Sequence, residues 1–539
     1  MKVAGNIVDV LHKRIFPGTI EIINGKIAGI TQDTKPYNQF IIPGFIDAHV
    51  HVESSMLSPN EFARLASLHG TIATVSDPHE IANVLGMDGV KFMIENGKSS
   101  PFKFFFGAPS CVPASPFETT GASLGADDVE ALLARDEIRF LGEVMNVPGV
   151  LSGDPDVMKK IESARRHGKP VDGHAPGLRG DDLVRYVRAG ISTDHEVLNY
   201  DEGREKLSLG MKLLVREGSA ARNMNTFLSL IEEFPGLCMF CSDDKHPHDL
   251  IEGHLNEMVK RAVRKGLDVM KVLRCACVNP VLHYNLPVGL LQKGDYADFL
   301  IVDNLQDFTV LATYIDGRKV AEKGKTSISS VLVEPLNNFF VRTKSVSDFS
   351  VNGASESMRV IEAIDGELIT GSATCQTKVE EGFAVSDTSR DILKMCVINR
   401  YSDGTPVIGF VNNFRLKRGA IASSIAHDSH NIIAVGADDE SLCRAINLII
   451  QHRGGIALID GNNEKILPLP LGGIMSNDDG WSVAHQYAEL DRHAKLLGSQ
   501  LRSPFMTLSF MALPVIPKLK LTDKGLFDGE KFTFTSLFV

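Results

Sequence analysis

Eight short apolar segments alternate with helical stretches between residues 43 and 284, and this alternation constrains the fold more than any other feature. We expect strands over 45–53, 71–77, 102–108, 139–145, 170–174, 191–195, 211–216 and 237–243. Helical patterns connect them, such as the stretch that begins at Pro155 and is closed by Gly168. Eight strand-then-helix units of this total length predict a (β/α)₈ TIM-like barrel, which builds its active site at the C-terminal ends of its strands.

Two β-rich blocks flank this middle section. The Asn24-Gly25 step in the first block is a strong hairpin signal, and a similar β-rich block returns at 294–323. We therefore expect 1–42 and 285–335 to form one small β-sandwich domain, with the barrel of residues 43–284 inserted between its halves. Beyond a polar segment at 340–370, strand-like stretches and a helix at 438–452 indicate a separate C-terminal α+β domain over 340–539.

Composition excludes several classes of partner. The net charge of −11 argues against a nucleic acid, because no basic stripe is available to replace counterions. No apolar stretch approaches the roughly 20 residues that span a bilayer, and no signal-peptide pattern opens the chain, so we expect a cytoplasmic protein with no membrane partner. The eight cysteines are scattered rather than arranged as a disulfide framework, and we interpret Cys238 and Cys241 as buried strand residues.

His49 and His51 lie at the end of the first predicted strand, directly after an apolar run that follows the Pro43-Gly44 turn signal. Side chains at positions i and i+2 of a strand point the same way, so two imidazoles aim at one point, as a metal site requires. Two histidines on a solvated strand face are the alternative. Matching residues at later strand ends favour the metal site.

Those later strand ends supply the rest of a metal-binding set: Glu143, His174, His195 and Asp243. Four imidazoles and two carboxylates suit two divalent ions, and Glu143 can supply the bridging anion that offsets the repulsion between them. A water held between two such ions would lose a proton near neutral pH and become a nucleophilic hydroxide. Asp243 would contact one ion and relay protons, although the strand phase does not separate it from Asp244.

Longer blocks around these residues carry a resemblance to a known family. The blocks are 43–55, 75–84, 172–177, 193–196, 216–219, 241–247 and 426–436. Through them the chain resembles the amidohydrolase superfamily and, more narrowly, the bacterial adenine deaminases, over nearly its whole length. Many amidohydrolases carry a carboxylated lysine on the fourth strand, whereas Glu143 stands here, as in adenine deaminases.

The resemblance implies hydrolysis of adenine to hypoxanthine and ammonia, with a metal-bridged hydroxide attacking C6. It implies Mn²⁺ or Fe²⁺ as the two divalent ions, although histidine and carboxylate ligands accept Zn²⁺ equally well. It also favours Asp243 over Asp244 as ligand, with Asp243 as the general acid and base. We expect adenine as the small-molecule partner and a homo-oligomer, either a dimer or a tetramer.

A second acid is needed near N1 or N7 of the purine. We name Glu217 as the second catalytic residue because it follows the seventh strand, with an ion pair to Arg216 as the alternative. Asp77, His79 and Glu80 are further candidates for this acid. A wider set is expected either to bind substrate or to orient the metal ligands: Asp77, His79, Glu80, Arg216, Ser54, Asp194 and Glu196.

The C-terminal motif around His427, Asp428 and His430 has three interpretations: it binds a further ion, closes over the barrel mouth, or is a hydrogen-bonded structural loop. Two other functions compete with adenine deamination. One is a different two-metal amidohydrolase that acts on a cyclic amide or a 6-substituted purine, and the other is a non-enzymatic protein on a decayed barrel. The decayed barrel predicts missing ligands, and none is missing. A cytidine-type zinc deaminase is excluded because the chain contains no P-C-x-x-C.

Overall fold

Eight parallel strands form a closed barrel in the computed structural model, which describes residues 1–539. One sheet holds β5 (Phe45–Val50), β6 (Thr71–Ser76), β7 (Lys103–Ala108), β8 (Ile138–Val144) and β9 (Val171–Gly173), and a second holds β10 (Thr193–Asp194), β11 (Lys212–Arg216) and β12 (Cys238–Cys241). Single parallel bridges, Val171 to Ile191 and Val50 to Asp243, join the two sheets at both edges and close the ring. The TIM-like barrel and its eight predicted strands are confirmed.

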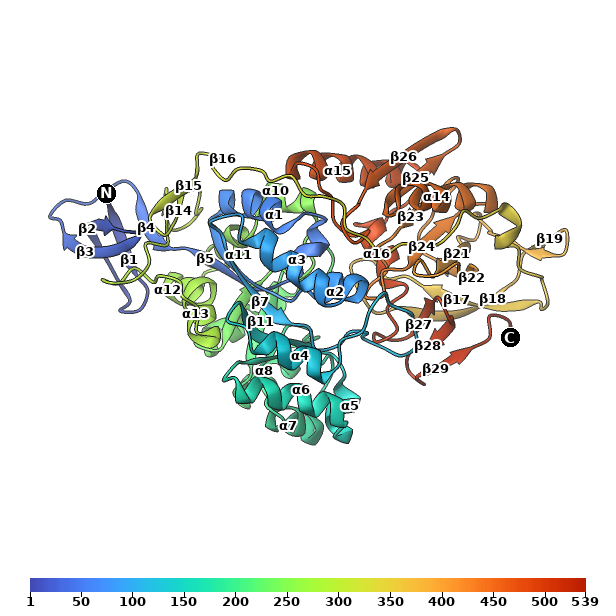
Figure 1. Cartoon of the computed structure of the whole chain (residues 1–539), viewed down its shortest axis with the longest axis horizontal. Coiled ribbons are helices and arrows are strands. Elements are labelled where there is room, and N and C mark those ends of the chain that lie inside the picture. The colour runs from blue at the N-terminus through green and yellow to red at the C-terminus, as the bar shows by residue number, and fades with distance from the viewer.

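Helices surround the barrel (Figure 1). In α11 (Leu255–Arg264) the buried residues Leu255, Met258, Val259 and Ala262 follow the spacing of one helical face. The other helices of this region are α1 (Pro59–Ala66), α2 (His79–Leu85), α3 (Met87–Gly97), α4 (Ala126–Leu133), α5 (Val147–Ser152), α6 (Pro155–Arg166), α7 (Gly180–Arg188), α8 (Tyr200–Ser208), α9 (Met224–Glu233), α10 (Pro247–Glu252), α12 (Val269–Leu273) and α13 (Asn279–Tyr284).

A single sheet takes strands from both flanks of the barrel and lies at the left of Figure 1. The N-terminal flank supplies β1 (Lys2–Asp9), β2 (Arg14–Ile23), β3 (Lys26–Gln32) and β4 (Phe40–Pro43); the other supplies β13 (Phe299–Val302), β14 (Val310–Ile315), β15 (Arg318–Glu322) and β16 (Lys325–Thr326). The Asn24-Gly25 hairpin is present, and both residues take the positive φ angles that such a turn needs. The edge strand β3 folds back onto residues 294–297, where the Ile27 amide donates to the Asp295 carbonyl at 2.9 Å.

The C-terminal part is built on a second eight-stranded sheet, ordered β18-β17-β22-β21-β24-β23-β25-β26. Its strands are β17 (Ser357–Glu362), β18 (Gly371–Gln376), β21 (Leu393–Ile398), β22 (Val407–Asn412), β23 (Ala420–Ser423), β24 (Ile432–Gly436), β25 (Gly455–Asp460) and β26 (Asn463–Pro468). The small strands are β19 (Val379–Glu380), β20 (Phe383–Ala384), β27 (Leu519–Thr522), β28 (Gly525–Asp528) and β29 (Thr533–Thr535). The predicted helix at 438–452 is α14 (Asp439–His452); α15 (Gly480–Leu496) and α16 (Pro504–Phe510) follow it.

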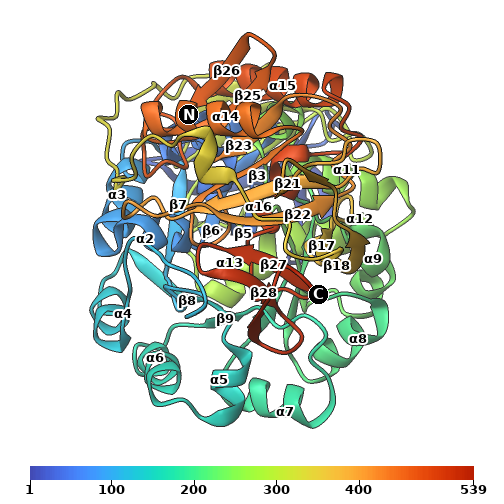
Figure 2. The same cartoon turned by 90° about the vertical axis from the view of Figure 1, so that its right-hand side faces the viewer.

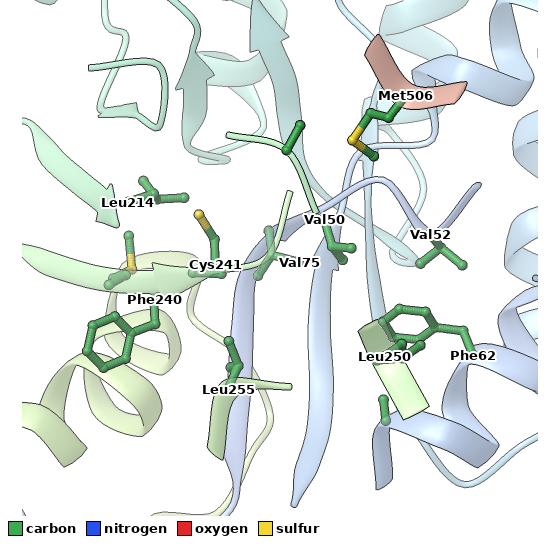
Figure 3. Close-up of a cluster of buried hydrophobic side chains, with 14 of the residues drawn as sticks. Val50, Val52, Phe62, Val75, Leu214, Phe240, Cys241, Leu250, Leu255 and Met506 are labelled. Atoms are coloured by element: carbon green, nitrogen blue, oxygen red, sulfur yellow. The ribbon is translucent and has the colours of Figure 1, made fainter. Parts of the chain in front are cut away.

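The C-terminal part lies against the barrel mouth, as the end-on view of Figure 2 shows. One continuous core of 119 buried residues runs through both parts. Figure 3 shows Met506 of α16 in the same cluster as Val50 and Val52, which lie at the exit of β5. No helix is long and apolar enough to cross a membrane. Cys238 and Cys241 are buried in β12, as expected, and neither is in a disulfide.

Candidate metal centre

The exits of β5 and β12 bring His49, His51 and Asp243 together. The Asp243 amide donates to the His49 carbonyl at 2.9 Å, and the His51 amide donates to the Asp243 carbonyl at 3.3 Å. Asp243 Oδ1 then lies 3.4 Å from His49 Nε2 and 3.3 Å from His51 Nε2. β5 ends at Val50, one residue before His51, yet the two imidazoles still converge, with their Nε2 atoms 3.2 Å apart.

Glu143 of β8 lies at the centre of the histidines. Its Oε1 is 3.3 Å from His51 Nε2, whereas its Oε2 is 2.9 Å from His174 Nδ1 and 3.1 Å from His195 Nε2. The two oxygens therefore contact different histidines. All six predicted metal-binding side chains are buried, and the most exposed of them, His174, has 8% of its surface accessible.

This donor set is suited to hold divalent metal ions. Ligand atoms lie within 4.8 Å of one another in three overlapping groups: His49 with His195 and Asp243, His49 with His51 and Glu143, and Glu143 with His174 and His195. Each histidine turns one ring nitrogen toward the two carboxylates: Nε2 of His49, His51 and His195, and Nδ1 of His174. Imidazole nitrogens and carboxylate oxygens that converge in this way are suited to hold metal ions.

The charges of the two carboxylates are set by their neighbours. Burial raises the pKa of Glu143, but the adjacent His195 and His174 outweigh burial and hold that pKa well below its usual range. Burial likewise raises the pKa of Asp243, and the Arg216 guanidinium is the largest of the effects that bring it well below its usual range. Both groups are therefore anionic at neutral pH, as metal ligands must be.

Arg216, the last residue of β11, orients Asp243 from the side away from the histidines. Its Nη1 donates to Asp243 Oδ2 at 2.8 Å, and its Nη2 donates to Glu196 Oε2 at 3.0 Å. Glu196 thus anchors the guanidinium, and the guanidinium fixes the rotation of the Asp243 carboxylate. The structure thus places Arg216 and Glu196 beside Asp243.

Asp77, just past β6, orients two other ligands. Its Oδ2 accepts the Glu143 amide hydrogen at 2.9 Å, and its carbonyl oxygen lies 3.0 Å from His51 Nδ1. A hydrogen bond from a histidine ring nitrogen to a backbone carbonyl fixes which of the two ring nitrogens faces a metal. Gly142 makes this approach possible, because a Cβ there would lie 2.3 Å from Asp77 Oδ2.

Two further expected residues make contacts of their own. Ser54 Oγ donates to Asp244 Oδ1 at 2.5 Å, which turns that oxygen of Asp244 toward the serine. Asp194 Oδ2 accepts from Lys206 Nζ at 2.7 Å. Asp243 presents an oxygen to His49, and Asp244 belongs with His51 and Asp243 to a group whose potential ligand atoms lie within 4.8 Å of one another.

Glu217 lies outside this cluster, contrary to its expected role as the second catalytic acid. Its Oε1 lies 2.7 Å from Arg261 and accepts the Met224 amide hydrogen at 3.1 Å. The alternative ion pair with Arg216 is also absent, because Arg216 is engaged by Glu196 and Asp243. The physical reason is the strand period: Arg216 points into the barrel, so the next residue points the opposite way.

His79 and Glu80, at the start of α2, connect the metal ligands to the C-terminal part. His79 Nδ1 lies 3.4 Å from Glu143 Oε1. Glu80 is held by two histidines of the C-terminal motif: Oε1 lies 2.5 Å from His427 Nδ1, and Oε2 contacts His430 Nε2. The motif therefore reaches the barrel mouth and closes over it.

A small cavity of about 30 Å³ lies between the candidate metal ligands and the C-terminal part. The C-terminal part supplies its roof, which consists of Leu368, His427, Asp428, Phe510, Leu513 and Val515. Four of these roof residues are apolar and were not identified from the sequence. No sequence signal marks them, because scattered apolar side chains of this kind are found in every hydrophobic core.

Family models match most of the chain. The amidohydrolase family model matches residues 40–320, and the model of the adenine deaminase C-terminal domain matches residues 367–533. A protein of Sulfurovum sp. named adenine deaminase is 52% identical over 535 residues, which cover 99% of each chain. The adenine deaminase of Methanosarcina mazei is 52% identical over 551 residues, covering 100% of this chain and 99% of that one.

Solved structures are more distant. The β-aspartyl dipeptidase of Fervidobacterium islandicum AW-1 is 14% identical with a TM-score of 0.45, and the match covers 60% of this chain and 96% of that one. The N-acetyl-D-glucosamine-6-phosphate deacetylase of Mycobacterium smegmatis is 16% identical with a TM-score of 0.45, covering 60% of this chain and 100% of that one.

Proposed function

The chain belongs to the adenine deaminase family of the amidohydrolases, and from that premise we propose how its buried site carries out the family reaction. That reaction is the hydrolytic deamination of adenine, in which water replaces the amino group at C6 and hypoxanthine and ammonia leave. One observation carries the assignment to this site: Glu143 contacts His51, His174 and His195 at once and lines the cavity at the barrel mouth.

Amidohydrolases depend on metal ions, and six side chains of this site are suited to hold a pair of them. We propose two divalent cations, Mn²⁺ or Fe²⁺ with Zn²⁺ as the alternative, held by His49, His51, Glu143, His174, His195 and Asp243. When bound, such cations act as Lewis acids that lower the pKa of water toward neutrality. The convergence of one ring nitrogen from each histidine on Glu143 and Asp243 supports this ligand set.

Asp243 is the proposed base and acid of the reaction. Arg216 occupies its Oδ2, so Oδ1 is the oxygen left to take up a proton. In this role Asp243 removes a proton from the attacking water and returns it to the departing amino group, as general acid–base catalysis requires. The low pKa that Arg216 imposes on Asp243 favours its release of that proton.

His79 is the proposed hydrogen-bond donor to a ring nitrogen of adenine. C6 of a purine becomes a good electrophile only when N1 or N7 is protonated or hydrogen-bonded. Among the candidate residues, Glu217 lies outside the cavity, and both oxygens of Glu80 are taken by His427 and His430. His79 lines the cavity, and its Nδ1 has no hydrogen-bond partner in the protein.

We also propose domain boundaries for the parts of the chain that flank the barrel. We assign residues 1–42 and 285–335 to one β-sandwich domain and residues 340–539 to an α+β domain. The sheet that takes strands from both ends of the barrel supports the first assignment. The second is supported by the sheet of β17 to β26 and by the roof that this part builds over the cavity.

Metal analysis of the purified protein together with an ammonia-release assay tests the function. The assay compares adenine with adenosine, 6-substituted purines and cyclic amides, and we expect turnover of adenine by protein that holds two ions per chain. Turnover confined to the cyclic amides would contradict the proposal.

In Glu143→Ala we expect loss of both ions and of activity together, because the variant removes the carboxylate shared by three histidines. A variant that kept two ions and normal turnover would show that the bridging position is wrongly assigned.

A further inference from the structure

Asp428 is the only acidic side chain in the roof of the cavity. It belongs to the C-terminal part, lines the cavity, and has 5% of its surface accessible. Its Oδ1 lies 3.8 Å from His79 Nε2, and its Oδ2 has no hydrogen-bond partner. A buried carboxylate oxygen without a donor is unfavourable, so its position beside a ligand cavity indicates that a ligand supplies the donor.

The residues around Asp428 do not satisfy it. No lysine or arginine lies within ion-pair distance of the carboxylate, and the nearest histidines are His79 at 3.8 Å and His427 at 4.0 Å. His427 is already engaged by Glu80 through the same nitrogen, Nδ1, that is nearest to Asp428. The neighbouring buried acid, Glu118, makes no hydrogen bond to it. A purely structural role would leave Oδ2 of Asp428 unpaired.

Asp428 lies at the end of the cavity away from the reacting centre. One imidazole ring separates it from the metal ligands, because His79 Nδ1 lies 3.4 Å from Glu143 while Nε2 lies 3.8 Å from Asp428. His79 therefore lies between Asp428 and Glu143. When C6 faces the metal ligands, the imidazole half of adenine is the part that reaches toward Asp428, and its N–H is the only donor there.

The rest of the roof suits the faces of a flat ring. The Phe510 ring stacks on His427 with centroids 4.9 Å apart and an interplanar angle of 20°, and Leu513 and Val515 extend this apolar surface. The roof therefore offers one polar acceptor within an apolar wall, which is how small-ligand sites fix orientation.

We propose that Asp428 is a specificity-determining residue for the free base: its carboxylate accepts a hydrogen bond from the imidazole N–H of adenine. This inference rests on the proposed function. A purine substituted at N9, as in a nucleoside, has no imidazole N–H and leaves the buried carboxylate unpaired. Sites built around such a hydrogen bond reject analogues that lack it.

Product binding tests the proposal without relying on turnover. Dissociation constants for hypoxanthine and 9-methylhypoxanthine are measured by calorimetry on the metal-loaded wild type, Asp428→Ala and Asp428→Asn. We expect Asp428→Ala to raise the dissociation constant of hypoxanthine by about 10- to 150-fold, which is the range for a hydrogen bond to a charged group. The dissociation constant of 9-methylhypoxanthine should change by less than about twofold. Asp428→Asn keeps an acceptor oxygen without the charge, so its loss is expected to be smaller. In both Asp428 variants the KM for adenine should rise as the affinity for hypoxanthine falls, while kcat changes little.

The matched control is Asp491→Asn, which removes a buried acidic charge from α15 of the same domain, where Asp491 pairs with Lys495. Equal weakening of both products in Asp428→Ala would show a structural role and overturn the proposal, as would unchanged binding of hypoxanthine. Loss of one metal ion in Asp428→Ala would also overturn it, since Asp428 would then be a ligand. A wild type that deaminates no adenine would instead contradict the proposed function, so the two failures are distinguishable.

Discussion

Asp243 combines two demands on one side chain, because it must present an oxygen to the histidine cluster and also exchange a proton. Arg216 holds Oδ2, so Oδ1, which faces His49 and His51, is the oxygen that must meet both demands. The backbone assists, since Asp243 has a φ of 53° that turns its side chain back over the exit of β5. Non-glycine residues adopt this conformation rarely, and it is found often at functional sites.

Asp243→Asn is expected to lower kcat by about 10²–10⁴-fold, because asparagine cannot take up the proton, while KM stays within about threefold. Steady-state kinetics on protein reconstituted with metal measures both constants. Metal content is determined on the same preparations, so that loss of an ion is not mistaken for loss of the base. A variant with unchanged kcat and a raised KM would show that Asp243 binds substrate and transfers no proton.

At the scale of elements, the exits of β6 and β8 form one unit around the Asp77 carboxylate. Asp77 holds the amide of Glu143, and this contact needs the absence of a side chain at Gly142. Strand β8 thus carries a glycine directly before its metal ligand for a steric reason. Not every strand glycine is crowded in this way, because a Cβ added at Gly29 in β3 would meet no atom within 4 Å.

Gly142→Ala is expected to displace Asp77 and to weaken metal affinity by about 10- to 100-fold, the usual effect of losing a partner that orients a ligand. Competition with a chromophoric chelator measures the affinity. Gly29→Ala is the control, and we expect it to bind metal as the wild type does. Equal metal affinity in Gly142→Ala and the wild type would show that Asp77 does not orient Glu143.

At the scale of the whole molecule, the site is complete only when the C-terminal part is docked on the barrel. Contacts across this boundary include Glu80 with His427 and His430, and the ring of His246 packed 4.6 Å from that of Tyr487. Burial and the nearby His248 lower the pKa of His246 to about 3, so this interface contains a histidine that stays neutral.

This neutral histidine makes docking sensitive to acid. The pKa of an unfolded histidine is about 6.5, so between that pH and about pH 3 the unfolded chain binds a proton that the native chain excludes. The free energy of unfolding therefore falls as the pH falls. At pH 5.5 the loss from His246 alone is about 1.4 kcal/mol relative to pH 7.5. Between pH 7.5 and pH 5.5 the free energy of unfolding of His246→Leu should fall by about 1.4 kcal/mol less than that of the wild type. Urea denaturation at both pH values measures this difference. Parallel losses in the two proteins would contradict the assignment.

The sequence predicted the site correctly where metal-binding residue types stand at positions that the strand period places on one face. His49 and His51 share a strand face by their spacing, and Glu143, His174, His195 and Asp243 each follow an apolar segment, so their convergence at one barrel end could be predicted. The prediction failed at Glu217, because a shift of one residue at a strand exit turns the side chain to the other face.

The order of strands, the barrel and the identity of the candidate metal ligands were determined by the sequence itself, because short-range periodicity and residue chemistry are written along the chain. Only the tertiary structure decided which exit residues face the cavity and what covers it. Arg216, Asp77 and the roof around Asp428 and Phe510 acquire their places through contacts between segments far apart in the chain. Such contacts depend on long-range packing of side chains, which leaves no periodic signal in the residues that make them.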